Sequence, residues 1–205
     1  MGHVFRSVGK HLDQSSYPGD TILEIGSDRY EGSSYYFADL ATCHDMKFIT
    51  IDLDVSAIQR SRKNIPTEWH DHCEFVVGDG AEWTKRVLPE LNPTIRIVYL
   101  DNFDWDWETE KHSDMIEQQK AWYKKRNIQM TNLNSQVSHL TQMINIMPYL
   151  APKCIVCVDD TYDYKGVFIG KGGAVVPYLL SNGFGMLEYH SHTVILGRGY
   201  TNYIV

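Results

Sequence analysis

The chain has 205 residues, of which 43% are hydrophobic and 22% charged, and a net charge of −7. This length suits one domain with a sizeable core, and no apolar run reaches the roughly 20 residues that span a bilayer. The acidic balance and the absence of a basic cluster beyond Lys124–Arg126 disfavour nucleic acid as a partner. Residues 1–10 lack the apolar stretch of a secretory signal, so we expect a cytoplasmic protein.

The cysteines are Cys43, Cys73, Cys154 and Cys157. Cys154 and Cys157 have the spacing of zinc and redox sites, but no second motif of this kind supplies further zinc ligands. Both fall in an apolar run typical of a buried strand, where positions three apart point to opposite faces. We interpret them as small buried residues in a reducing compartment.

Short apolar runs alternate with helical patterns after a leading helix at about residues 3–14. Strands are predicted at 21–25, 47–52, 73–77, 95–100 and 154–158, each nearly continuous in apolar character, as in parallel strands buried on both faces. Helices are predicted at 33–43, 55–63, 81–88 and 135–147. In the last helix, Val137, Leu140, Ile144 and Met147 share one apolar face. The alternation predicts an α/β fold with helices on both faces of the sheet.

The end of the chain and one long connection differ from this pattern. Runs at 186–190 and 192–198 predict an antiparallel pair that closes the sheet. Residues 102–134 form a connection rich in tryptophan and charge, and long connections are more often functional than idle. We expect a lid or substrate wall, with Phe103 and Trp105 over the mouth of a site. A surface helix at 114–126 that covers the core is the alternative interpretation.

The segment Leu23–Ser34, of sequence LEIGSDRYEGSS, is typical of a ligand-binding turn. An apolar run stops at Gly26, and Gly32 opens the predicted helix. Glycines allow a close approach of the backbone, and free amides at a helix start can face a ligand. A dinucleotide site would carry three glycines in six positions, so a nucleotide-binding oxidoreductase is the less favoured alternative.

Acidic residues follow most of the predicted strands, namely Asp52, Asp79, Asp101, Asp159 and Asp160. Helix caps explain any one of them, but ligands bind at this edge of a parallel sheet, and we expect a shared site. Asp52 is expected to accept ribose hydroxyls and Asp79 an adenine amino group. Asp101, Asp159 and Asp160 would repel one another unless a cation joined them. Oxygen ligands suit a divalent cation, with Mg²⁺ preferred and Mn²⁺ or Ca²⁺ as alternatives.

These motifs resemble the class I S-adenosylmethionine-dependent methyltransferases, and in particular their metal-dependent branch of catechol O-methyltransferase-like and macrocin O-methyltransferase-like enzymes. The resemblance spans about residues 20–200 and implies a Rossmann-like, doubly wound, mostly parallel sheet with an antiparallel final strand. We expect residues 1–205 to form a single domain. It also implies S-adenosylmethionine as cofactor, a divalent cation at Asp101, Asp159 and Asp160, and O-methylation of a small-molecule or sugar hydroxyl. The cofactor-binding residues would be Glu24, Gly26, Ser27, Gly32, Ser33, Ser34, Asp52, Asp79, Gly80, Ala81 and Phe103.

The catalytic base departs from the catechol-type pattern, because no lysine follows Asp101 closely. Asp104 and His139 are the candidates beside Asp101, and His112 is a further one. The segment Gly166–Gly173 is interpreted as a flexible loop that opens a helix, with Lys171 as an alternative point charge for an anion. A homodimer and a non-catalytic binding protein on the same fold both stay open.

Overall fold

The computed structural model describes residues 4–12, 17–27, 31–107, 113–190 and 192–204. Its strands are β1 (Asp20–Ile25), β2 (Lys47–Asp52), β3 (Cys73–Val77), β4 (Thr94–Leu100), β5 (Leu150–Val158), β6 (Thr161–Tyr164), β7 (Val167–Gly170), β8 (Gly185–His190) and β9 (Thr193–Arg198). Its α-helices are α1 (Ser33–Cys43), α2 (Val55–Asn64), α3 (Gly80–Arg86), α4 (Leu88–Leu91), α5 (Ser113–Lys124), α6 (Asn132–Ile146) and α7 (Val175–Ser181). Short 3₁₀ helices are η1 (Val4–His11), η2 (Thr67–His72), η4 (Met147–Tyr149) and η5 (Lys171–Gly173).

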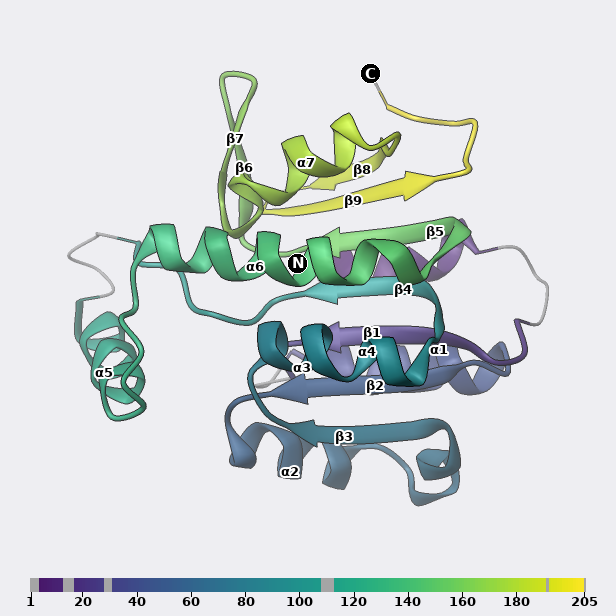
Figure 1. The fold of residues 1–205 in the computed structure, drawn as a ribbon, viewed down its shortest axis with the longest axis horizontal. Coiled ribbons are helices and arrows are strands. Elements are labelled where there is room, and N and C mark those ends of the chain that lie inside the picture. The colour runs from purple at the N-terminus through teal and green to yellow at the C-terminus, as the bar shows by residue number, and fades with distance from the viewer. Residues whose placement is uncertain (1–3, 13–16, 28–30, 108–112, 191, 205) are drawn as a thin grey trace.

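Seven strands form one sheet in the order β3-β2-β1-β4-β5-β9-β8 (Figure 1). Strands β1 to β5 are parallel to one another, whereas β9 runs antiparallel to both β5 and β8. The predicted α/β class, the parallel strands and the closing antiparallel pair are therefore confirmed.

The two faces of the sheet carry separate apolar cores. In Figure 1, α3, α4, α6 and α7 lie in front of the sheet, and α1 lies behind it. Neighbouring residues of β1 serve opposite cores, since Leu23 packs on the α4 and α6 side and Ile22 packs on the η1 and α1 side. Burying one such side chain stabilises the folded protein by about 1.5–3 kcal/mol. Because the central strands bury side chains on both faces, the carboxyl ends of these strands are held in fixed positions. Cys154 and Cys157 also lie in opposite cores, as predicted, and both are free thiols.

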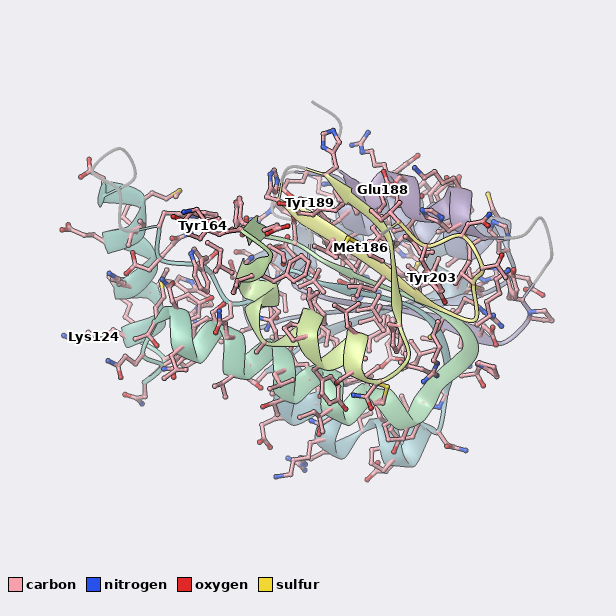
Figure 2. The ribbon with its side chains drawn as sticks, turned by 90° about the horizontal axis from the view of Figure 1, so that it is seen from above. Lys124, Tyr164, Met186, Glu188, Tyr189 and Tyr203 are labelled. Carbon is pink, nitrogen blue, oxygen red and sulfur yellow. The ribbon has the colours of Figure 1, made fainter. Side chains whose placement is uncertain are left out.

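The edge strand β8 is partly covered by both ends of the chain. The amide of Ile204 donates to the carbonyl of Met186. Glu188 accepts from Ser7 Oγ at 2.8 Å and forms an ion pair with Lys10 at 2.6 Å. Figure 2 shows Tyr203 beside Met186 on this side of the sheet. No helix among the described residues is long and apolar enough to cross a membrane.

Two expectations about local structure are wrong. The segment interpreted as a loop forms β7, which pairs with β6 in a hairpin, and it continues into η5. In the predicted helix at 135–147, Leu140 and Met147 pack against the core, but the expected partners on their face, Val137 and Ile144, are about half exposed. The fully buried residues of α6 are Ser135, His139, Gln142, Met143 and Ile146. A polar face of α6 therefore points inward, because the loop after β4 offers it polar partners.

The structure describes the long connection after β4 except for residues 108–112, which include the candidate base His112. It contains α5, which Figure 1 shows beyond the carboxyl ends of the parallel strands. Asp106 ties the connection to the start of α6, because its amide donates to Asn132 Oδ1 at 2.8 Å and its carbonyl accepts from Asn132 Nδ2 at 3.0 Å. The connection thus faces the sheet edge at which ligands were predicted.

Candidate functional site

The carboxyl ends of the central strands are joined by backbone hydrogen bonds that continue beyond the strands. Gly26 donates to Ile51, Asp101 donates to Ile25, and Asp159 donates to Leu100, at 2.8, 2.9 and 3.1 Å. The first residues after β1, β4 and β5 therefore stand side by side. This ladder brings Gly26, Asp101 and Asp159 together, as the sequence predicts.

Gly26 is required by the geometry at this point. Its φ is +101°, and a Cβ there would lie 2.5 Å from the amide nitrogen of Asn102 and from the carbonyl carbon of Asp101. Any side chain would push the two strand ends apart. The loop that follows reaches Gly32, whose φ of +84° starts α1 without a side-chain cap. Residues 28–30 of the motif lie outside the described residues.

Glu24 lies beneath this turn and is fully buried. Its carboxylate accepts from Ser34 Oγ at 2.5 Å and from Thr50 Oγ1 at 2.6 Å. Ser27 Oγ lies 2.5 Å from Thr50 Oγ1, and Ser61 Oγ donates to Ser34 Oγ. Glu24 and Ser34 thus join β1, β2 and α1 from within, and hydroxyl donors offset the cost of burying the acid.

Asp52 holds the same turn from the neighbouring strand. Its two carboxylate oxygens accept from the amides of Ser27 and Asp54, at 2.9 and 2.7 Å. Asp54 itself caps α2 by accepting from Ser56, so it is not the ligand-facing acid. Asp52 is 5% exposed and lines a pocket, where its remaining lone pairs can accept from a ligand.

That pocket, called here the cofactor pocket, lies between the strand ends and the connection after β4. It is lined by Ile25, Ile51, Asp52, Leu53, Gly78, Asp79, Gly80, Asn102, Phe103, Trp122, Tyr123 and Ile128. The lining is aromatic and aliphatic with the carboxylates of Asp52 and Asp79, a combination that suits a nucleoside. Asp79 is exposed and also caps α3, because it accepts from the Glu82 amide at 2.9 Å.

Aromatic residues of the connection close the cofactor pocket. The ring of Phe103 stacks on that of Tyr123, with centroids 4.9 Å apart. The Tyr123 hydroxyl accepts from the amide of Asp104, and Phe103, at φ +52°, is held by Ser135 Oγ, which donates to its carbonyl at 3.0 Å. Trp105 lines neither this pocket nor the one described next.

A second, polar pocket adjoins the first across the end of β4. It is lined by Ser27, Glu31, Ser33, Asp101, Asp104, Asp160 and Lys171. Among the lining residues that the structure describes, several carboxylates face the ammonium of Lys171, so this part of the pocket favours neutral or cationic groups over anions. Of the predicted cofactor ligands, Asp52, Asp79, Gly80 and Phe103 line the first pocket and Ser27 and Ser33 the second. Glu24, Gly26, Gly32, Ser34 and Ala81 line neither.

Lys171, which the sequence suggested only as a point charge for an anion, instead pairs with two carboxylates of the chain itself. Its ammonium lies 2.6 Å from Asp101 Oδ1 and 3.0 Å from Asp160 Oδ2, and the side chain is only 4% exposed. Burial alone would lower the pKa of Lys171, but the Asp101 and Asp160 carboxylates outweigh burial and hold that pKa well above its ordinary value. The chain itself therefore supplies a positive charge to the site.

Asp160 pairs with Lys171, whereas its neighbour Asp159 accepts hydrogen bonds from neutral groups. Its Oδ1 accepts from Thr193 Oγ1 at 2.6 Å and from the Asp160 amide at 3.0 Å, and its Oδ2 accepts from the buried Tyr99 hydroxyl at 3.0 Å. With Lys171 between Asp101 and Asp160, the predicted trio does not converge on one empty point. One oxygen each of Glu31, Asp101 and Asp159 nevertheless lie within 4.8 Å of one another.

His139 is fully buried on α6 and lines neither pocket. Its Nδ1 lies 2.7 Å from the carbonyl of Ser135, within hydrogen-bonding distance. Burial, and then the nearby Lys171 charge, lower the pKa of His139 to about 4, so the ring is neutral at physiological pH. A direct exchange of protons with a substrate is therefore not favoured at His139, whereas Asp104 lines the polar pocket.

Comparison with solved structures shows similarity along nearly the whole chain. A proposed rRNA methylase from Clostridium thermocellum matches with a TM-score of 0.59 and 11% identity over 96% of this chain and 97% of that chain. A proposed methyltransferase from Streptococcus mutans, in complex with S-adenosylhomocysteine, matches with a TM-score of 0.58 and 12% identity over 96% of this chain and 98% of that chain. The TDP-rhamnose 3'-O-methyltransferase of calicheamicin biosynthesis matches with a TM-score of 0.57 and 17% identity over 96% of this chain and 76% of that chain.

No family model matches the sequence, and no curated protein matches it significantly. The likeness is therefore one of three-dimensional structure at low sequence identity. The strand order and the antiparallel β9 agree with it. The chain has the Rossmann-like fold of the S-adenosylmethionine-dependent methyltransferases.

Proposed function

We propose that this protein is an S-adenosylmethionine-dependent methyltransferase that methylates a hydroxyl group of a small molecule or sugar. The observation that carries the proposal is the pair of adjoining pockets at the ends of β1 and β4, one aromatic with Asp52 and one polar. The aromatic pocket would hold the adenosine of the cofactor. The polar pocket would hold the charged methionine end and the acceptor, so that methyl donor and oxygen meet near Asp101.

The site residues suit the two cationic groups of this cofactor. S-adenosylmethionine carries a sulfonium and an ammonium group, and the carboxylates of the polar pocket attract both. The methyl transfer itself requires in-line approach of the acceptor oxygen and exclusion of water. Asp104 is the proposed proton acceptor, because it lines the polar pocket next to Asp101. RNA is not the proposed acceptor, because carboxylates dominate this pocket.

A divalent cation is a second candidate element of the site. The close grouping of Glu31, Asp101 and Asp159 favours it, whereas the trio predicted from sequence does not, because Lys171 lies between Asp101 and Asp160. A bound Mg²⁺ ion would lower the pKa of the acceptor hydroxyl. The two candidates differ in whether the chain or the solution supplies the positive charge at Asp101.

The connection at 102–134 is proposed to act as a lid within a single domain of residues 1–205. Trp122 and Tyr123 of α5 line the cofactor pocket, so the cofactor cannot enter or leave without a displacement near them. Such a lid would also exclude water during methyl transfer.

Replacing Asp52 with Asn should weaken S-adenosylmethionine binding by about 10- to 100-fold, since one charge-assisted hydrogen bond contributes about 1.5–3 kcal/mol. Calorimetric titration measures this change. Asp54→Ala is the matched control: it removes the α2 cap, which costs about 1 kcal/mol of stability, and should leave cofactor affinity intact. Heat with NAD but none with S-adenosylmethionine in the wild-type protein would reject the proposed function.

Saturating S-adenosylhomocysteine should slow hydrogen exchange in α5 more than in α6, because the ligand would contact Trp122 and Tyr123 directly. Trp122→Ala should reduce this protection, whereas Trp105→Ala should not, because Trp105 does not line the cofactor pocket. A hydrogen-exchange rate in α5 that does not change when S-adenosylhomocysteine binds would contradict the proposal that this segment is a lid.

A further inference from the structure

We propose that Lys171 is the resident cation of the methyl-acceptor pocket and that methyl transfer here needs no divalent metal. This inference rests on the proposed function, which it deepens by choosing between the two candidate sources of positive charge. The observation behind it is the ammonium of Lys171 at 2.6 Å from Asp101 and 3.0 Å from Asp160.

The backbone holds Lys171 firmly in this position. The Lys171 amide donates to the Asp160 carbonyl at 2.9 Å, and the Gly172 amide donates to Thr161 Oγ1 at 3.0 Å. Gly170, at φ +85°, packs so tightly that a Cβ would lie 2.0 Å from the Asp160 carbonyl oxygen. The β6–β7 hairpin therefore delivers the lysine at a defined place, and no long mobile segment is needed to bring it there.

The charges of the pocket are compensated through this lysine. Its three N–H groups face Asp101 Oδ1, Asp160 Oδ2 and, at 3.4 Å, the Asp101 carbonyl. A divalent cation at Asp101 would stand within a few ångströms of a buried ammonium. Repulsion between the two would then oppose metal binding, because the low-dielectric surroundings screen it poorly. The lysine and the metal are thus alternatives at Asp101.

The lysine also suits the chemistry of methyl transfer. As the acceptor oxygen forms its bond to the methyl carbon, the carbon–sulfur bond breaks and the sulfonium becomes a neutral thioether. The hydroxyl proton passes to the Asp104 carboxylate and then to water. An N–H of Lys171 that turns from Asp160 toward the acceptor oxygen would stabilise the negative charge that develops there, as a Lewis acid would do in a metal-dependent site.

The test is binding of Mn²⁺ alone, measured by calorimetry and by thermal shift, on the full chain without acceptor. The wild-type protein should bind no Mn²⁺ at submillimolar concentration. Lys171→Ala should bind it at least roughly tenfold more tightly, because the carboxylates lose their compensating charge. Lys171→Arg keeps the charge and should behave like the wild type. Should Lys171→Ala fail to fold, the double substitution Lys171→Met and Asp160→Asn keeps both the net charge and the grouping of Glu31, Asp101 and Asp159, and it should bind Mn²⁺ more tightly than the wild type.

Submillimolar Mn²⁺ binding by the wild-type protein would overturn the inference, as would a folded Lys171→Ala protein with no gain in Mn²⁺ affinity. Titration of the same preparations with S-adenosylmethionine keeps the two proposals apart. Absence of cofactor binding would reject the proposed function, whereas metal binding together with intact cofactor binding would reject only the role of Lys171.

Discussion

Gly26→Ala should destabilise the protein by roughly 3 kcal/mol or more and should lower the affinity for S-adenosylmethionine. Two costs combine at this position. A side chain at φ +101° is strained, by about 1–2 kcal/mol. The new Cβ would also meet backbone atoms of Asp101 and Asn102 at 2.5 Å, and a backbone cannot move aside as cheaply as a flexible side chain. The displaced residues line the two pockets, Asn102 the first and Asp101 the second, so the substitution should weaken cofactor binding as well as stability.

Gly183→Ala is the matched control for this experiment. Gly183 also has a positive φ, of +82°, but no atom lies within 4 Å of its Cβ position. Gly183→Ala should therefore lower the free energy of unfolding only by the cost of the strained backbone conformation, about 1 kcal/mol. Urea unfolding of both variants measures the difference. Equal losses for the two glycines would mean that the close approach at the end of β1 contributes little.

The sheet was predictable from sequence because each of its central strands is buried on both faces. Such strands appear as short, nearly continuous apolar runs, and the bounds of 47–52 and 73–77 agree with β2 and β3. The order of the strands placed Asp101 and Asp159 at one edge before any geometry was known. The apolar runs and the observed strand order agree, so the sheet could be predicted from the sequence.

Lys171 was not predictable in the same way. Its glycine-rich surroundings are typical of a loop, and its strand neighbours become a hairpin only through pairing with Thr161–Tyr164. Its burial depends on two carboxylates that lie 11 and 70 positions away in the chain. A charge that is buried by distant partners leaves no local pattern. The residues chosen from sequence as metal ligands thus proved to include the partners of a lysine.

The inward face of α6 escaped prediction for a related reason. Apolar spacing selected Leu140 and Met147, which pack against the core, together with Val137 and Ile144, which are exposed. Ser135, which the spacing did not select, is buried and donates to the Phe103 carbonyl. Hydrophobic periodicity identifies a buried face only where the partner surface is apolar. Here the partner is a loop with backbone groups that need hydrogen bonds.

The buried His139 should make the protein less stable as the pH falls from 7 toward 4. Its pKa is about 4 in the folded protein and near 6.5 when unfolded, so between these values the unfolded chain binds more protons. The stabilisation is complete above pH 6.5 and is lost as the pH falls, by about 2–3 kcal/mol at pH 4.5. Below pH 4 the folded protein would also bind the proton, and the further loss would cease.

His139→Asn should flatten this pH dependence, because asparagine can still donate to the Ser135 carbonyl but cannot take up a proton. The exposed His190→Gln should keep the wild-type slope. Urea unfolding at pH 7.5, 6.0 and 4.5 compares slopes between variants, so a constant packing loss from the substitution cancels. An unchanged slope in His139→Asn would assign the acid sensitivity to the carboxylates of the site. A flattened slope would instead assign it to the buried His139, whose pKa is lowered first by burial and then by the Lys171 charge.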